Sequence, residues 1–139
     1  IGIKDSSGNV QRMRDIVSST PKAFRSLTGS ALTLPDALEA GASGAILAIA
    51  CAFPEACVDL FDAASRGDAQ RVERLRKHAI LPAANLATRF GIAGIKCAMD
   101  CLGYYGGPPR APLLPLGKPA EQEIEAILAS VKPATVAAN

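Results

Sequence analysis

The 139-residue sequence contains no tryptophan, a single histidine and only 4% aromatic residues. No apolar run approaches the ~20 residues that a membrane-spanning helix needs, and no segment has the pattern of a signal peptide. We therefore expect no membrane partner. The sequence does not begin with methionine and opens within a strand pattern, so we expect a fragment, a cleavage product or part of a longer protein. The lack of a targeting segment then says little about location.

An excess of charge of one sign is also missing. Fifteen Lys and Arg residues stand against thirteen Asp and Glu residues, which gives a formal net charge of +2, and the charges are scattered along the chain. Proteins that bind nucleic acids or anionic membranes carry a larger and more clustered positive charge. We therefore expect no nucleic-acid partner. The 49% hydrophobic content instead predicts a largely helical core with small side chains.

The four cysteines lack the paired spacing of a zinc site. Cys97 and Cys101 would share one face of a helix, but neither has a histidine nearby, and Cys51 and Cys57 lie much earlier in the chain. We predict buried free thiols and no metal site. Free thiols indicate a reducing compartment, so we expect a cytoplasmic protein, or a mitochondrial one if a transit peptide precedes this sequence.

The first residues predict a short strand that ends with an amine. With a period of two, Ile1 and Ile3 face one side and would pack on helices, whereas Gly2 and Lys4 face the other. If such strands close as a barrel, Lys4 lies at a carboxyl end, where barrels carry their chemistry. A neutral lysine can attack a ketone and form a Schiff base, and burial lowers the pKa of a lysine. The alternative is a strand-end lysine that extends to water or pairs with Asp5.

Two further strands follow, each with a helix. Residues 23–27 are the second predicted strand, and the continuous apolar run of residues 44–50 is typical of a parallel strand that is covered on both faces. Asn9, Thr33 and Pro54 mark the starts of the helices that follow the three strands. The pattern therefore predicts three parallel βα units.

Beyond residue 66 the strand pattern disappears. Because a full (β/α)8 barrel needs roughly 250 residues, we predict that residues 1–66 form half of a barrel and residues 67–139 form a helical extension. The predicted segments of the extension are a helix from Asp68 through Phe90 that is interrupted near Pro82, a helix from Ile92 to Leu102, an extended connector from Tyr104 to Pro115, a helix from Pro119 and a frayed tail after Pro133.

Four strings of the sequence resemble one enzyme family. They are GIKDSSGN at residues 2–9, LTGSA at 27–31, GAILAIA at 44–50 and RFGIAGIKCAMDCLGYYGGPPRAPL at 89–113. In this order they are similar to the second half of the dihydrodipicolinate synthase and N-acetylneuraminate lyase family of class I aldolases. The last string is similar to the 4-hydroxy-2-oxoglutarate aldolase branch in particular. The resemblance implies an α/β fold, the C-terminal half of a (β/α)8 TIM barrel with its last three βα units, followed by a helical C-terminal extension.

The resemblance also implies roles for five residues. The family's Schiff-base lysine falls on Lys4, and its substrate-contacting hydroxyl falls on Ser6. The glycine and its neighbour that line the pocket fall on Gly29 and Ser30, and an apolar contact falls on Ile46. Lys4 would condense with the C2 carbonyl of a 2-oxo acid such as pyruvate. The iminium would then be the electron sink for cleavage or formation of the C3–C4 bond, with no metal or organic cofactor.

We expect the parent protein to be a lyase that cleaves 4-hydroxy-2-oxoglutarate, or a similar short 2-oxo acid, to pyruvate and an aldehyde. Ala31, Leu32 and Ala48 stand where the sialic acid lyases of the family hold a polyol tail, which favours a short substrate. One alternative is a dihydrodipicolinate synthase, which condenses pyruvate with aspartate semialdehyde. The other is a non-catalytic half barrel that serves as an interaction module.

The resemblance leaves part of the chemistry outside this sequence. The family's relay tyrosine and its carboxylate-binding turn belong to the first half of the barrel. Tyr104 and Tyr105 lie in the connector, where we expect them to pack it rather than to replace the relay. We therefore expect the chain alone to be inactive, to need the missing N-terminal half barrel as a partner, and to form homo-oligomers as the family typically does.

Overall fold

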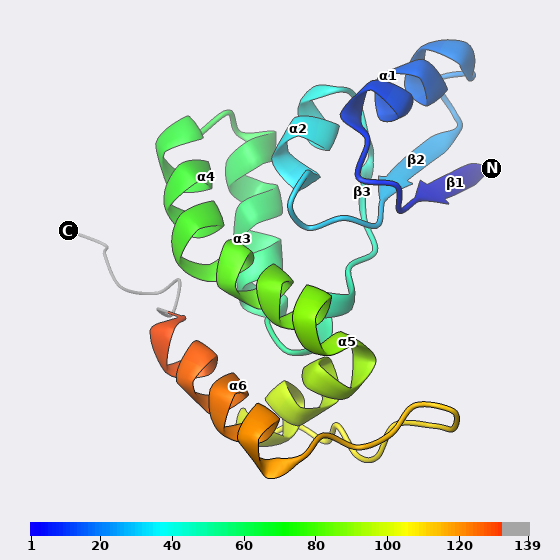
Figure 1. Ribbon diagram of the computed structural model, residues 1–139. Coiled ribbons are helices and arrows are strands. Elements are labelled where there is room, and N and C mark those ends of the chain that lie inside the picture. Colours follow the sequence, from blue (N-terminus) through cyan, green and yellow to red (C-terminus); the bar gives the residue numbers. More distant parts are fainter. Residues whose placement is uncertain (132–139) are drawn as a thin grey trace.

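The computed structural model describes residues 1–131, so the tail predicted after Pro133 lies outside the described residues. Three parallel strands form one sheet in the order β1 (Gly2–Asp5), β2 (Arg25–Thr28) and β3 (Gly44–Ala45) (Figure 1). In the sheet register, Asp5 lies opposite Thr28, and Thr28 lies opposite Ala45. The strands therefore end at one level, and the chain leaves all three at the same edge of the sheet.

Each strand is followed by a helix, as the sequence predicts. α1 (Val10–Ser19) begins where Asn9 Oδ1 accepts a hydrogen bond from the Arg12 backbone N–H at 3.0 Å. α2 (Leu34–Glu39) and α3 (Pro54–Ser65) each have a proline in the first turn, where a backbone N–H would have no partner within the helix. The three predicted βα units are confirmed.

The second and third strands have other limits than the sequence predicts. β2 begins at Arg25 rather than at residue 23, and β3 ends at Ala45 rather than at residue 50. The apolar run continues instead into a 3₁₀ helix, η1 (Ala48–Cys51). A short apolar run satisfies either backbone, so hydrophobicity alone could not separate the two.

The rest of the described chain is helical. α4 (Ala69–Leu75), a π-helical turn η2 (Arg76–Ile80) and α5 (Leu81–Cys101) follow one another, and α6 (Lys118–Ser130) packs on α5 (Figure 1). The predicted helical extension is therefore present in this part.

The two interruptions that the sequence predicts in the long helix correspond to a π-helical turn and a kink. Pro82 lies in the first turn of α5, directly after the π-helical turn, so the chain stays helical where the sequence predicts a break. The wider turn accommodates a residue that has no N–H to donate. The predicted boundary before Ile92 coincides with Gly91, whose φ of 60° and ψ of −148° kink α5.

One apolar core joins the strand-bearing part to the helical part. Leu60 of α3, Ile80 of η2 and Ile124 of α6 belong to the same cluster and have no exposed surface. Each such side chain contributes about 1.5–3 kcal/mol when it is buried. The core thus contains residues from both sides of residue 66. The division into a domain of residues 1–66 and a domain of residues 67–139 stays a prediction.

All four cysteines are free thiols, but they are not all buried. Burial raises the pKa of the Cys57 thiol to about 11. Burial, together with the neighbouring Cys101, also raises the pKa of Cys97 to about 11. Cys51 and Cys101 are exposed at the last positions of η1 and α5, so the prediction of buried thiols is wrong for these two. Within residues 1–131, no three His, Cys, Asp or Glu side chains are grouped so as to hold a metal ion.

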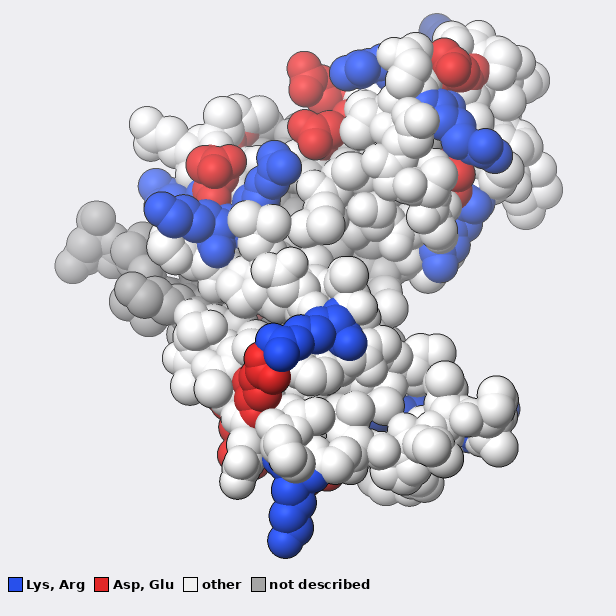
Figure 2. All heavy atoms as spheres, viewed as in Figure 1, with Lys and Arg blue, Asp and Glu red and all other residues white. Residues whose placement is uncertain are grey.

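The surface differs from the prediction at β1. Ile1 is fully exposed and Ile3 is 41% exposed, so their predicted packing on helices is wrong for the described chain. In the sheet formed by the described residues, β1 is an edge strand whose neighbour is β2. Figure 2 shows acidic and basic side chains interspersed over the visible face, without a patch of one sign. None of the helices in the described part of the chain is long and apolar enough to cross a membrane.

Candidate functional site

The carboxyl edge of the sheet gathers the residues that the sequence predicts as a site. Ser6, Gly29 and Ile46 each follow the last paired residue of a strand. Backbone bonds hold them in step, because the Gly29 N–H donates to the Asp5 carbonyl at 2.7 Å and the Ile46 N–H donates to the Thr28 carbonyl at 2.9 Å. The ladder of the sheet therefore extends into the loops that carry the candidate residues.

Lys4 and Ser6 meet at Gly29. A β-carbon built on Gly29 would lie 2.8 Å from Lys4 Cε and 2.8 Å from Ser6 Cβ, and it would overlap the Ser6 hydroxyl. Carbon atoms pack at about 3.5–4.0 Å. The two side chains thus occupy the space that any side chain at position 29 would need. The structure brings Lys4, Ser6 and Gly29 together on one face of the sheet, as the alternation along β1 predicts.

A pocket of about 250 Å³ opens beside these residues. Ser6, Gly29 and Ser30 contribute to it from the strand ends. Lys4 and Ile46 are not part of its lining; Lys4 is exposed, and Ile46 is 53% exposed. Small-molecule pockets measure roughly 300–1,000 Å³, so this pocket alone has room for part of a metabolite. Its other lining residues are Ala31, Leu32, Leu47, Ala48, Ile49, Ala84, Ala87 and Thr88.

Helix α5 supplies a wall of this pocket that the sequence analysis missed. Ala84, Ala87 and Thr88 are three and four residues apart and lie on one helix face. The Thr88 hydroxyl donates to the Ala84 carbonyl at 2.9 Å, so its hydrogen is already used within the helix. Small residues at helical spacing are equally typical of ordinary helix packing. Only the tertiary fold identifies them as a pocket wall.

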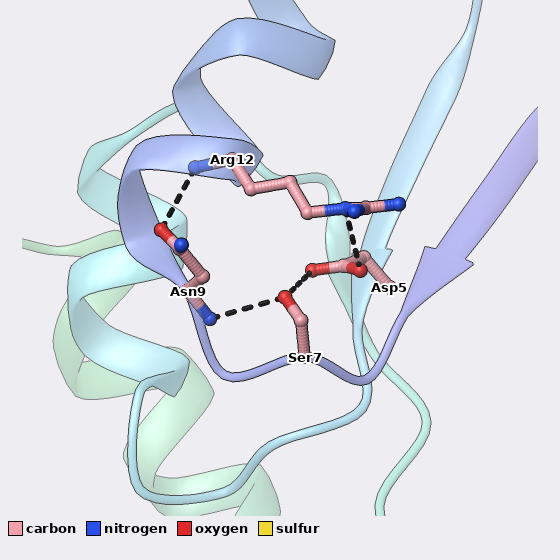
Figure 3. Close-up of polar contacts among 4 residues, drawn as sticks. All are labelled: Asp5, Ser7, Asn9 and Arg12. Atoms are coloured by element: carbon pink, nitrogen blue, oxygen red, sulfur yellow. Dashed lines mark hydrogen bonds and ion pairs between the residues drawn. The ribbon is translucent and has the colours of Figure 1, made fainter.

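A ring of polar contacts holds the turn between β1 and α1 (Figure 3). Asp5 Oδ2 accepts from Ser7 Oγ at 2.6 Å, and Asp5 Oδ1 lies 3.2 Å from Arg12 Nε. Ser7 Oγ accepts from the Asn9 backbone N–H at 3.2 Å. Within residues 1–131, the ion pair of Asp5 is with Arg12 and not with Lys4, which corrects the alternative in which Lys4 pairs with Asp5.

The connector before α6 is fixed to α5 at some distance along the helix from this pocket. Asp100 Oδ1 accepts from the Gly106 N–H at 2.8 Å, and Lys96 Nζ donates to the Gly106 carbonyl at 2.5 Å. Tyr104 is 45% exposed and Tyr105 is 84% exposed, and neither lines the pocket. A β-carbon built on Gly107 of the connector would lie 3.0 Å from Tyr105 Cζ and Oη, so this ring packs on the connector as predicted, although most of its surface is exposed.

The whole described chain matches one enzyme family. The sequence pattern of the dihydrodipicolinate synthetase family matches residues 1–131. The chain belongs to this family. It is 30% identical over 128 residues to the 4-hydroxy-tetrahydrodipicolinate synthase of Ralstonia nicotianae. The aligned region covers 92% of this chain and 44% of the Ralstonia protein. It is also 30% identical over 133 residues to the protein of the same name from Archaeoglobus fulgidus, which covers 94% of this chain and 45% of the relative.

Solved structures of the dihydrodipicolinate synthetase family have the same fold. The synthase from Bacteroides thetaiotaomicron superposes with a TM-score of 0.85 at 27% identity, over 93% of this chain and 46% of that one. The synthase from Oceanobacillus iheyensis gives a TM-score of 0.82 at 25% identity, over 94% of this chain and 45% of the Oceanobacillus chain. The predicted α/β fold, three parallel βα units of a TIM barrel followed by helices, is confirmed. The chain spans less than half the length of these relatives.

Replacing Gly29 with alanine should separate Lys4 from Ser6. The added methyl group would lie 2.8 Å from Lys4 Cε, so we expect this atom to move by about 0.7 Å or more to reach ordinary contact. A crystal structure of the variant measures the shift. Gly117→Ala is the matched control, because a β-carbon there has only Pro119 Cδ nearby, at 3.8 Å. A Gly29→Ala structure in which Lys4 and Ser6 keep their positions would contradict the packing described above.

Proposed function

We propose that this chain carries the Schiff-base half of a family enzyme that acts on pyruvate, with Lys4 as the catalytic residue. The observation that supports this most is the contact at Gly29, where the Lys4 side chain and the Ser6 hydroxyl meet at the carboxyl edge of a parallel sheet. In barrels of this kind the chemistry is located at that edge. The proposed substrate-binding residues are Ser6, Gly29, Ser30 and Ile46.

The proposed chemistry follows from the amine. Neutral Lys4 Nζ attacks C2 of the 2-oxo acid to give a carbinolamine, which takes up one proton and loses water to form a protonated imine. This cation accepts the electron pair when a C3 proton is removed or when the C3–C4 bond breaks. The Ser6 hydroxyl can donate a hydrogen bond to the carboxylate of the bound substrate. The reaction requires neither a metal ion nor an organic cofactor.

The relatives favour a synthase over the cleavage reaction that we expect from the sequence. Two relatives that cover most of this chain are named 4-hydroxy-tetrahydrodipicolinate synthase. We therefore propose condensation of pyruvate with aspartate semialdehyde as the leading reaction. Cleavage of 4-hydroxy-2-oxoglutarate is the second candidate, because the string of residues 89–113 resembles that branch. The apolar pocket lining of Ala31, Leu32 and Ala48 suits a short substrate in either reaction.

A partner for the open sheet is part of the proposal. β1 and β3 each pair on one side only, and Ile1, Ile3 and Ile46 are exposed on or beside them. An apolar hollow of about 470 Å³ lies along β3 and α3, lined in part by Leu27, Val58 and Phe61. Unpaired edges and uncovered apolar surface favour association. We propose that further strands of the same barrel cover these surfaces, and that complete barrels assemble into homo-oligomers.

Borohydride reduction in the presence of pyruvate should label Lys4 in the complete protein. The reduced imine adds the mass of the pyruvate skeleton to the peptide that contains Lys4, which tandem mass spectrometry locates. Lys4→Arg keeps the charge but forms no stable imine, so we expect it to abolish the label and to lower turnover by at least about 10³-fold. Lys22→Arg is the control. A label on another lysine, or no label at all, would refute the proposed role.

Parallel assays should separate the two candidate reactions. We expect the complete protein to consume pyruvate only when aspartate semialdehyde is present, with little release of pyruvate from 4-hydroxy-2-oxoglutarate. The ratio of the two kcat/KM values measures the preference. A higher kcat/KM for the cleavage reaction would make the second candidate the function.

The 139-residue chain by itself should associate and should lack turnover. Its sheet has two open edges, and the relay tyrosine and carboxylate-binding turn that the family resemblance implies are not among its residues. Sedimentation velocity and the two assays test both expectations. A stable, active monomer would contradict the half-barrel account. If the complete protein is also inactive and Lys4 takes no label, the remaining alternative is a non-catalytic interaction module.

A further inference from the structure

Four consecutive contacts close into a ring around the turn that carries Lys4 and Ser6 (Figure 3). The Arg12 side chain contacts Asp5, Asp5 accepts from Ser7, Ser7 accepts from the Asn9 backbone, and Asn9 accepts from the Arg12 backbone. The ring starts and ends at one residue of α1. It therefore ties the end of β1 to the first turn of the helix.

Asp5 is the member of the ring on which the others depend. Both of its carboxylate oxygens are used, Oδ2 for the Ser7 hydroxyl at 2.6 Å and Oδ1 for Arg12 at 3.2 Å. The residue is only 9% exposed, whereas the Arg12 side chain is 62% exposed. A buried carboxylate needs such partners, because its desolvation is otherwise costly. The Asp5 carboxylate is therefore stabilised by the Ser7 hydroxyl and the Arg12 guanidinium rather than by solvent.

The ring connects directly to the candidate site through the backbone. Asp5 stands between Lys4 and Ser6, and its side chain lies on the opposite face of the strand from theirs. Its carbonyl accepts from the Gly29 N–H at 2.7 Å, so the same peptide also fixes the glycine against which Lys4 and Ser6 pack. A shift of the Asp5 carboxylate would therefore rotate the peptides on both sides of it.

We propose that Asp5, with Arg12 as its counter-ion, is a positioning residue that aims the Lys4 amine and the Ser6 hydroxyl at the substrate. This inference rests on the proposed Schiff-base function. It states that Asp5 and Arg12 increase the rate of that reaction. Asp5 does not touch the substrate in this account. It acts by holding the turn from the helix side while Gly29 supports the turn from the sheet.

The test compares variants of the complete protein that remove the charge or its partner. Asp5→Asn keeps the shape of the side chain but removes its charge and therefore the ion pair, and Arg12→Ala removes a side chain that is 62% exposed. We expect each to lower kcat, and the rate of pyruvate labelling at Lys4, by roughly 10- to 100-fold. KM for pyruvate should change less than kcat. The double variant should be no slower than the slower single variant, since both break one ring.

Two controls separate positioning from loss of fold. Asp15→Asn removes the same charge from an exposed site on α1, where the Asp15 carboxylate accepts a hydrogen bond from Gln11 Nε2 at 2.9 Å, and it should leave kcat unchanged. Arg12→Lys keeps the positive charge and should restore part of the rate that Arg12→Ala loses. All rates are measured at a temperature at which circular dichroism shows each variant fully folded, so that a purely structural role would leave kcat at the parent value.

The outcomes distinguish this inference from the function on which it rests. If the parent protein labels at Lys4 while Asp5→Asn and Arg12→Ala label and turn over at the parent rate, the positioning role is wrong and the Schiff-base function stands. The same conclusion follows if the fold-losses in kcat of the two single variants multiply in the double variant. If the parent protein itself takes no label at Lys4, the proposed function fails and this inference fails with it.

Discussion

The parallel register of the three strands is the constraint on which the candidate site depends. Asp5, Thr28 and Ala45 lie side by side in the sheet, so the residues that follow them are brought to one edge although they are far apart in the sequence. A slip of one residue would turn Lys4 to the helix-covered face and Asp5 to the other. The backbone bond from Gly29 to Asp5 and the ring around Asp5 both act at this edge. Register, turn and glycine together fix where the amine lies.

Helix α5 extends the site beyond the strands. It belongs to the segment that follows the last βα unit, yet Ala84 and Ala87 line the same pocket as Gly29 and Ser30. The core that joins Leu60, Ile80 and Ile124 holds α5 in this position. The helical part therefore stabilises the fold and also limits the size of a group that can enter the pocket.

Local rules predicted much of this structure from the sequence. Alternation along residues 1–4 gave the face of Lys4, and the caps and first-turn prolines at Asn9, Thr33 and Pro54 gave the helix starts, because these signals act within a few residues. The family strings supplied Ser6, Gly29 and Ser30, which the structure places around one pocket.

The remaining features depend on contacts between distant residues. The early end of β3, the π-helical turn before Pro82 and the α5 wall follow from tertiary packing, which the local sequence does not encode. The exposure of Ile3 has the same origin, because burial of an edge strand depends on the neighbour that it finds. The ion pair of Asp5 has the same origin, because the first turn of α1 brings Arg12 to it, whereas the sequence offered only the adjacent Lys4 as an alternative partner.

We propose that the strand register and the turn aim Lys4 at a substrate bound beside Ser6 and Gly29. A crystal structure of the complete protein soaked with pyruvate and reduced in the crystal tests this most directly. We expect continuous density from Lys4 Nζ to C2 of the adduct, with the carboxylate end beside Ser6 and the Gly29 backbone. An adduct on another lysine, or Lys4 unmodified and turned away from Gly29 with pyruvate bound elsewhere, would contradict it.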